Sequence, residues 1–400
     1  MRIKDFGINE IFDSRGNSTI EVGIAVGNGL AFYSSLPAGK SRGSEEAAVL
    51  PFAAASSAAN RKRLGAITNR DFKTQRSFDE FLIALDGTKN KRKLGGNVML
   101  GLSMSFARGL AAEKREEVWE FLQEEFFGAS GGAAVWEPVI FSNLVNGGEH
   151  AANNLDIQEY MVLAGTKGGV KSAVKKLIAF YGALGERLSS LKRAANIAVG
   201  DEGGYSLDFK NNLEPLAILA DLIREKKFSG SFRLGMDAAA NGFFSDGKYR
   251  FDGKTVTTGN LAAIYERYFK KIPALYSIED PFAERDVSGF SLLSETLQDK
   301  IVVGDDLTVT NRELIGKYAG EGIIGGVIVK PNQAGTVTEA AEALREARDR
   351  GIKAIVSHRS GETDDVFIIH LAKAARAYGV KIGAPVRERI FKFNELLRIV

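Results

Sequence analysis

The 400-residue sequence contains no cysteine, only three histidines and only two tryptophans. The absence of cysteine excludes a disulfide framework, a thiolate metal site and a cysteine nucleophile, so any metal must be held by oxygen or histidine ligands. No run of 18 apolar residues occurs, and residues 1–5 lack the apolar core of a signal peptide. We therefore expect a cytoplasmic protein without membrane insertion.

The chain also lacks a large excess of either basic or acidic residues. Lys and Arg number 53 against 50 Asp and Glu, which gives a formal net charge of +3 without any block of like charge. Because nucleic-acid binding requires a concentrated basic surface, we expect no nucleic-acid partner. The hydrophobic fraction of 44% and the charged fraction of 26% are typical of a globular protein with a sizeable core.

The amino-terminal part of the chain has the pattern of a sheet followed by helices. Residues 3–12 and 18–36 alternate apolar and polar side chains, and Gly27-Asn28-Gly29 is a hairpin-turn signal. From about residue 44 to residue 127 the spacing becomes helical, for example over 95–113. These features predict an antiparallel sheet covered by helices.

Small residues separate this part from the rest of the chain. The run Gly-Ala-Ser-Gly-Gly-Ala-Ala at 128–134 interrupts the helical pattern and is typical of a linker. We predict an α+β domain over 1–127, a linker over 128–134 and a catalytic domain over 135–400. Two domains agree with the usual length of about 100–200 residues per domain.

Beyond the linker, short apolar runs repeatedly end in a charged or polar group. Each run is typical of a buried strand, and helical segments at 213–226, 260–271 and 336–350 lie between them. The runs are IAVGDE (197–202), FRLGMD (232–237), LYSIED (275–280), IVVGDD (301–306), GVIVK (326–330) and AIVSHR (354–359). An open doubly wound sheet would place chemistry at one or two strand ends, whereas at least five carry it here. A β/α barrel of the TIM type is favoured because all its strand ends face one mouth.

Three carboxylates at consecutive strand ends indicate a metal site. Asp237, Glu279 and Asp305 would repel one another strongly at one mouth without a cation. Oxygen-only ligands favour Mg²⁺ over zinc. The alternative is that each acid only caps the helix that follows it.

A lysine and a further carboxylate complete a possible acid–base pair. Lys330 follows the run GVIV, and nearby positive charge would lower the pKa of its ammonium and make a neutral amine available as a base. A lysine base beside Mg²⁺ is a pattern that is already attributed to enolase-superfamily sites. Glu202 in a glycine-rich turn is a candidate acid for a leaving hydroxyl. The alternative for Lys330 is a side chain that only extends to solvent.

The run at 354–359 continues into a segment that could hold a phosphate. Arg359 offers paired donors and Ser360 a hydroxyl, so we expect an anionic phosphorylated substrate. His150 and His358 lie in polar segments, whereas His370 lies within VFIIHLAKAA and is expected to pack in a helix.

Taken together, several short motifs of the sequence resemble those of enolase. They are DSRGN, NGGEHAANNLDIQEYM, GDEGG, SIEDPFAE, GDDLTVTN, KPNQAGT, SHRSGETDD and RERIFKFNELLRI. The resemblance runs from residue 3 to the carboxyl terminus. It implies a small sheet-and-helix domain ahead of an atypical barrel whose first strands run antiparallel, and a homodimer or higher homo-oligomer. It also implies the reversible, Mg²⁺-dependent dehydration of 2-phosphoglycerate to phosphoenolpyruvate in glycolysis and gluconeogenesis.

The resemblance also implies roles for individual residues. Asp237, Glu279 and Asp305 correspond to the ligands of one Mg²⁺, and Ser41 in the loop 37–43 to a ligand of a second. Lys330 would remove the C2 proton, Glu202 would help expel the C3 hydroxyl, and Glu159 would support Glu202. The remaining catalytic residues would be Lys381 and His358, and the substrate-binding residues His150, Gln158, Arg359, Ser360 and Lys381.

The sequence departs from the family in this loop. The family pattern Ser-Gly-Ala-Ser-Thr-Gly corresponds here to Ala38-Gly39-Lys40-Ser41-Arg42-Gly43, with two additional cations. This difference leaves second-metal binding and loop closure open.

Other functions fit the sequence less well. Gly39-Lys40-Ser41 suggests a nucleotide-binding loop, but the glycine required five positions earlier is Ser34. A lyase of the same superfamily acting on another carboxylate would share the three acids and the lysine, but not the SHRSGE segment. A non-catalytic scaffold or binding protein would be expected to lose Lys330 or a metal ligand.

Overall fold

The computed structural model describes the chain except for residues 28, 41–42, 129–134, 192–196 and 229. Ser41, predicted to hold the second Mg²⁺, therefore lies outside the described residues, as does the linker from residue 129 on. The domain boundary at 127/135 stays a prediction. None of the helices in the described part of the chain is long and apolar enough to cross a membrane.

The predicted amino-terminal sheet is confirmed. Strands β1 (Ile3–Phe12), β2 (Ser18–Val26) and β3 (Ala31–Ser35) pair antiparallel in that order. The long helix α4 (Gly96–Lys114) packs against β2 and β3, as the helical pattern predicted. Gly101 of α4 lies so close that a Cβ would come within 2.6 Å of Val22, so only glycine permits this packing. The other helices of this part are α1 (Phe52–Ala55), α2 (Ala58–Leu64), α3 (Gln75–Asp86) and α5 (Val118–Phe127).

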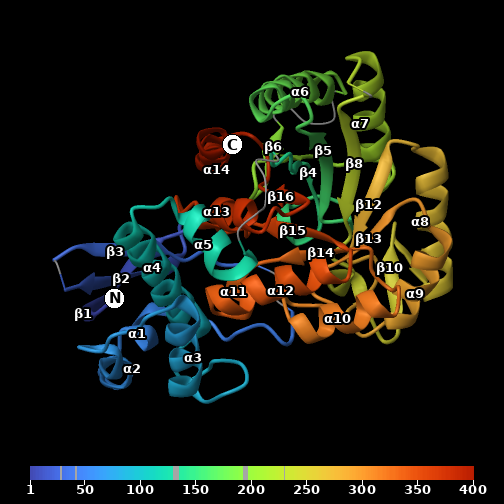
Figure 1. Cartoon of the computed structure of the whole chain (residues 1–400). Helices are drawn as coiled ribbons and strands as arrows, with labels where there is room; N and C mark the ends of the chain where they lie inside the picture. The colour runs from blue at the N-terminus through green and yellow to red at the C-terminus, as the bar shows by residue number, and fades with distance from the viewer. Residues whose placement is uncertain (28, 41–42, 129–134, 192–196, 229) are drawn as a thin grey trace.

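The rest of the chain forms a closed barrel of eight strands, beside which the amino-terminal sheet lies (Figure 1). The barrel closes because β16 pairs with β4. In spatial order the strands are β4 (Val139–Asn146), β5 (Glu159–Gly165), β8 (Phe232–Asp237), β12 (Leu275–Glu279), β13 (Ile301–Gly304), β14 (Gly326–Val329), β15 (Lys353–Ser357) and β16 (Gly379–Lys381).

The direction of β5 makes the barrel atypical. It runs antiparallel to both neighbours, β4 and β8, whereas the other neighbouring pairs are parallel. Its first residue, Glu159, pairs with Asp237, the last residue of β8. Glu159 therefore reaches the same mouth as the carboxyl ends of the parallel strands. This confirms the antiparallel start that the enolase resemblance implied.

One predicted barrel strand is wrong. The run at 197–202 contains only the two-residue strand β6 (Ala198–Val199), which forms a hairpin with β7 (Tyr205–Ser206) outside the barrel wall. The glycines of the turn explain this, because a Cβ on Gly204 would lie 2.3 Å from Oδ1 of Asn146. Tyr205 of β7 pairs in parallel with Val145 of β4. Three barrel strands, β4, β5 and β16, are missing from the prediction.

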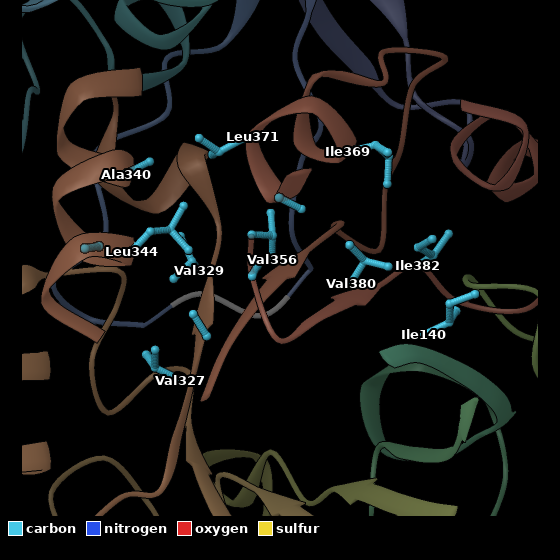
Figure 2. Packing of buried hydrophobic residues seen from close by; sticks show 14 of the residues in the cluster. Ile140, Val327, Val329, Ala340, Leu344, Val356, Ile369, Leu371, Val380 and Ile382 are labelled. Atoms are coloured by element: carbon cyan, nitrogen blue, oxygen red, sulfur yellow. The ribbon is translucent and has the colours of Figure 1, made fainter. Parts of the chain in front are cut away.

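Helices surround the barrel, and apolar side chains fill the space between the two layers (Figure 2). Val327 and Val329 of β14 face outward to Leu344 of α12, while Ile328 between them belongs to a separate cluster with Met161. This alternation is the period of a strand with both faces buried. The surrounding helices are α6 (Val170–Ser190), α7 (Glu214–Glu225), α8 (Thr258–Lys271), α9 (Val287–Thr296), α10 (Arg312–Gly320), α11 (Pro331–Ala334), α12 (Val337–Asp349), α13 (Phe367–Ala374) and α14 (Ile390–Ile399). A small sheet, β9 (Phe244–Ser245), β10 (Lys248–Phe251) and β11 (Lys254–Val256), lies ahead of α8.

A buried carboxylate joins the amino-terminal helices to the barrel. Asp79 of α3 accepts hydrogen bonds from the backbone N–H (2.9 Å) and hydroxyl (2.6 Å) of Thr338 in α12, and from the amide of Gln75 (3.0 Å). Burial raises the pKa of Asp79 to about 6 even though these donors favour its charged form. The interface therefore prefers a protonated carboxyl group.

The raised pKa predicts a pH-dependent stability. Because Asp79 binds its proton more tightly in the folded chain, its contribution is fully present below about pH 4 and is lost as the pH rises through about 6. The free energy of unfolding of wild type, relative to Asp79→Asn, should fall by up to about 3 kcal/mol over this range. Urea unfolding of both proteins from pH 4 to 7.5 measures it. A constant difference would mean that Asp79 does not titrate there.

Candidate active site

A lysine at the centre of the barrel mouth contacts carboxylates from three strands. Nζ of Lys381, at the end of β16, lies 3.1 Å from Oδ2 of Asp237 and 2.8 Å from both oxygens of Glu279. It also lies 3.0 Å from Oε2 of Glu159. All four side chains are buried. One ammonium group therefore faces three carboxylates, and the site carries an excess of negative charge.

The pKa values reflect this excess. Burial raises the pKa of Glu279 well above its usual range, and the charge of Asp237 raises it further, although Lys381 opposes both effects. Burial lowers the pKa of Lys381, but the surrounding carboxylates outweigh burial and raise it. A divalent cation would balance the charge that one ammonium group leaves. The donor set, which consists of buried carboxylate oxygens, fits Mg²⁺.

The third predicted metal ligand is paired with the second lysine. Asp305 follows β13, and its Oδ2 accepts a hydrogen bond from Nζ of Lys330 at the end of β14. Its Oδ1 accepts from the amide of Gln333 at 3.1 Å. Asp305 thus lies at the same mouth as Asp237 and Glu279, but a different lysine neutralises it.

The charge of Asp305 decides the direction in which the pKa of Lys330 shifts. We expected neighbouring positive charge to lower it; burial, Arg359 and Lys381 do act in that direction, but the charge of Asp305 outweighs them and the pKa is raised. The expectation concerned the positive charge of a nearby metal ion, so it stays a prediction. A neutral amine at Lys330 requires another cation to take up the charge of Asp305.

Glu202 lies in a pocket of polar side chains at the mouth. Its Oε2 accepts a hydrogen bond of 3.0 Å from the amide of Asn143, and its Oε1 lies 3.5 Å from Nε2 of His358 and 3.6 Å from Nδ1 of His150. One oxygen of Glu202, one of Glu159 and one nitrogen of His150 lie within 4.8 Å of one another, a group that could hold a metal ion. Sequence reasoning missed Asn143, which no motif singled out.

The pKa values of the two carboxyl groups of this pocket shift in opposite directions. Burial raises the pKa of Glu159 well above its usual range, and the charge of Glu202 raises it further. Burial acts to raise the pKa of Glu202 as well, but His358 and His150 outweigh burial and lower it. Burial lowers the pKa of His358 to about 4. Glu159 therefore binds a proton more readily than Glu202 does.

The segment after β15 is held rigidly beside this pocket. The guanidinium of Arg359 lies 3.2 Å from both carboxylate oxygens of Glu46, and Arg389 donates to the carbonyl oxygens of Arg359 (2.8 Å) and Ser360 (2.6 Å). The hydroxyl of Ser360 accepts from Arg15 at 3.3 Å. Arg15 and Arg389 occur in the motifs DSRGN and RERIFKF, so a signal for them existed. Glu46 had none.

Residues from the amino-terminal part of the chain cover this segment. Ala38 and Gly361 exchange backbone hydrogen bonds of 2.8 and 3.0 Å. Gly39 lies directly against Arg359, and a Cβ at Gly39 would come within 1.7 Å of the guanidinium. Residue 39 must therefore be glycine for the loop to occupy this position.

The contact at Gly39 yields a prediction. Gly39→Ala should raise KM for a phosphorylated substrate about tenfold or more, because the methyl group displaces either the loop or the guanidinium that we expect to bind phosphate. Steady-state kinetics measure this effect. Gly7→Ala is the matched control, since a Cβ at Gly7 meets no atom within 4 Å. An unchanged KM in Gly39→Ala would show that the loop does not pack this way during turnover.

A cavity of about 460 Å³ opens beside the carboxylates. Gln158 lies in its wall and is only 5% exposed, and its role in substrate binding stays a prediction. His370, by contrast, packs in α13 away from the mouth and pairs with Glu395 at 3.0 Å, which confirms it as a helix packing residue. The other residues in the cavity wall are Lys40, Gly148, Glu149, Leu155, Asp156, Ala239, Asn241, Gly242, Phe243 and Asp306.

Asp280 is a supporting residue that the motif search did not interpret. It follows Glu279 in the motif SIEDP and has a left-handed backbone with φ of 39°. Its carboxylate accepts hydrogen bonds from the backbone N–H groups of Asp305 (2.9 Å) and Asp306 (2.7 Å). Asp280 thereby fixes the chain that presents Asp305 to the mouth.

This fold and this site define a barrel enzyme for acid–base chemistry on an anionic substrate. Two family models match the chain: "Enolase, N-terminal domain" over residues 3–122 and "Enolase, C-terminal TIM barrel domain" over 134–400. The chain belongs to the enolase family and is a lyase.

Named relatives match over nearly the full length. Enolase from Aeropyrum pernix is 37% identical, with 100% of this chain and 95% of the relative covered. Enolase from Sulfolobus acidocaldarius is 36% identical with the same coverage. Enolase from Lactobacillus acidophilus is 37% identical, with 98% of this chain and 92% of the relative covered.

Proposed function

We propose that this protein interconverts 2-phosphoglycerate and phosphoenolpyruvate by reversible dehydration with Mg²⁺. One observation carries the proposal: carboxylates and two lysines at the ends of β5, β8, β12, β13, β14 and β16 converge on one mouth, next to Arg359. The family and its named relatives support the same activity. We also propose a cytoplasmic homodimer, which rests on the family resemblance alone.

Asp237, Glu279 and Asp305 would hold one Mg²⁺, and Ser41 a second. The bound ions would stabilise the negative charge that accumulates on the substrate carboxylate when the C2 proton leaves. Lys381, which contacts Asp237 and Glu279, would position and neutralise that carboxylate.

Lys330 and Glu202 would divide the proton transfers. Lys330 takes the C2 proton as a neutral amine once the charge of Asp305 is taken up by a cation. Glu202 assists the departure of the C3 hydroxyl as water, and Glu159 is the neighbouring group that holds a proton for it. His150 and His358 flank Glu202, and Gln158 lies in the wall of the adjoining cavity.

Arg359 and Ser360 would bind the phosphate group. A guanidinium that is only 4% exposed pairs well with an anion, since paired N–H donors match phosphate oxygens. This contact separates the proposed reaction from that of a superfamily lyase acting on an unphosphorylated carboxylate. The intact set of ligands and lysines also argues against a non-catalytic scaffold.

Substrate comparison tests the proposal. Purified protein with Mg²⁺ should generate the ultraviolet absorbance of an enol double bond from 2-phosphoglycerate but not from glycerate or from a sugar acid. Addition of a chelator should stop the reaction. Turnover of a sugar acid instead would favour the other lyase, and no turnover of any substrate by folded protein would favour the scaffold.

A further inference from the structure

Lys40 connects two sides of the barrel mouth. Its backbone N–H donates a hydrogen bond of 3.0 Å to the hydroxyl of Ser360. Its Nζ lies 3.5 Å from Oδ2 of Asp201, the residue next to Glu202. One residue of the amino-terminal part of the chain therefore contacts both the proposed phosphate-binding segment and the turn that carries the proposed acid.

Asp201 is itself placed to receive this cation. Its backbone N–H donates to the carbonyl of His150 at 3.3 Å, and its own carbonyl accepts from Arg389 at 3.1 Å. Its Oδ2 is buried and accepts no hydrogen bond from the described residues. Among these residues, Lys40 supplies the only ion pair of Asp201. A buried carboxylate oxygen without another donor favours a nearby ammonium group strongly.

The charges of the adjoining cavity point to the same residue. Among the described residues in the cavity wall, the other ionisable side chains are the carboxylates Glu149, Asp156 and Asp306, and Lys40 is the only base. An anionic substrate that enters there meets one positive charge. The family pattern Ser-Gly-Ala-Ser-Thr-Gly has alanine at the position of Lys40.

We infer that Lys40 is a positioning residue: its ion pair with Asp201 ties residues 37–40 to the turn of Glu202 and closes the mouth over bound substrate. The inference rests on the proposed function, because it concerns the same substrate. An ion pair between residues 37–40 and the turn of Glu202 stabilises the closed arrangement. A ligand that binds this arrangement best then binds more tightly.

Kinetics of matched variants test the inference. Lys40→Met and Asp201→Asn should each raise KM for 2-phosphoglycerate about fivefold, the upper end for a half-exposed pair, with kcat nearly unchanged. The double variant should be no worse than either single one, and Lys40→Arg should restore the wild-type KM. Lys114→Met is the control, since Lys114 is similarly exposed (41% against 45%) and pairs with Glu124 away from the mouth.

The pattern of results separates this inference from simple attraction of the substrate. If Lys40 acted only through its charge on the cavity, Asp201→Asn would leave KM unchanged or lower it, and that result would overturn the inference. Additive effects in the double variant would also overturn it.

Amide hydrogen exchange decides the inference independently of turnover. The backbone N–H of residue 40, which donates to Ser360, should exchange about fivefold faster in both single variants than in wild type. Equal exchange rates in all proteins would contradict the tie. A wild type that failed to dehydrate 2-phosphoglycerate would refute the proposed function, while the exchange rates would still decide whether Lys40 holds the loop.

Discussion

Lys330→Ala should lower kcat for 2-phosphoglycerate by at least about a thousandfold. The substitution removes the only amine paired with Asp305 at the mouth among the described residues, and a positioned general base contributes about 10²–10⁴ to the rate. KM should change far less, because the phosphate and carboxylate contacts at Arg359 and Lys381 remain. Absorbance of the enol product measures kcat, and exchange of the C2 hydrogen in deuterated water measures proton removal.

Lys91→Ala is the control for this variant. Lys91 has a similarly buried side chain (9% exposed against 13%) and pairs with Glu339 at 2.8 Å outside the mouth. Loss of a buried lysine should therefore lower the stability of both variants. C2 exchange, by contrast, should be lost only in Lys330→Ala. Rapid C2 exchange in Lys330→Ala would assign the base to another residue.

Lys381→Met should make the stability of the protein depend strongly on Mg²⁺. In the presence of a chelator, the loss of the ammonium leaves Asp237, Glu279 and Glu159 as uncompensated buried carboxylates. Removing one partner of a buried ion pair typically costs about 3–5 kcal/mol. Saturating Mg²⁺ should recover a large part of this free energy of unfolding, because an ion that binds only the folded state stabilises it.

Thermal or urea unfolding with and without Mg²⁺ measures this effect. The matched control is Lys392→Met, since Lys392 is also buried and pairs with a single carboxylate, Glu362. We expect Lys392→Met to be destabilised to the same degree with or without Mg²⁺. If Mg²⁺ rescued neither variant, the carboxylates around Lys381 would not be the metal site.

Much of the fold followed from local patterns. Alternation predicted β1–β3, and helical spacing predicted α4, α7, α8 and α12 to within a few residues. The run at 197–202 was wrongly predicted as a barrel strand, because apolar residues followed by acids are typical of such strands. The close packing of its glycines against β4 decides its structure instead. Strand β5 was not predicted because it is buried on both faces and runs antiparallel to its neighbours. Its acidic residue therefore stands at the beginning of the strand and not at the end.

The residues that form the site could be predicted from the sequence better than the contacts between them. Asp237, Glu279, Asp305 and Lys330 follow directly from strand ends, whereas the roles of Lys381 and Glu159 came only with the family resemblance. The pairing of Lys381 with Glu159 depends on strands far apart in sequence, and local spacing carries no information about it. The contact of Lys40 with Asp201 likewise depends on how the amino-terminal loop docks.

We propose that Lys330 removes the C2 proton of 2-phosphoglycerate and that Glu202 separately serves the leaving hydroxyl. Nuclear magnetic resonance of this substrate in deuterated water with Mg²⁺ follows C2 exchange and phosphoenolpyruvate formation in the same sample. We predict that wild type shows both, and that Glu202→Gln continues to exchange the C2 hydrogen while forming almost no product. Folded wild-type protein that neither exchanges this hydrogen nor forms phosphoenolpyruvate would contradict the account.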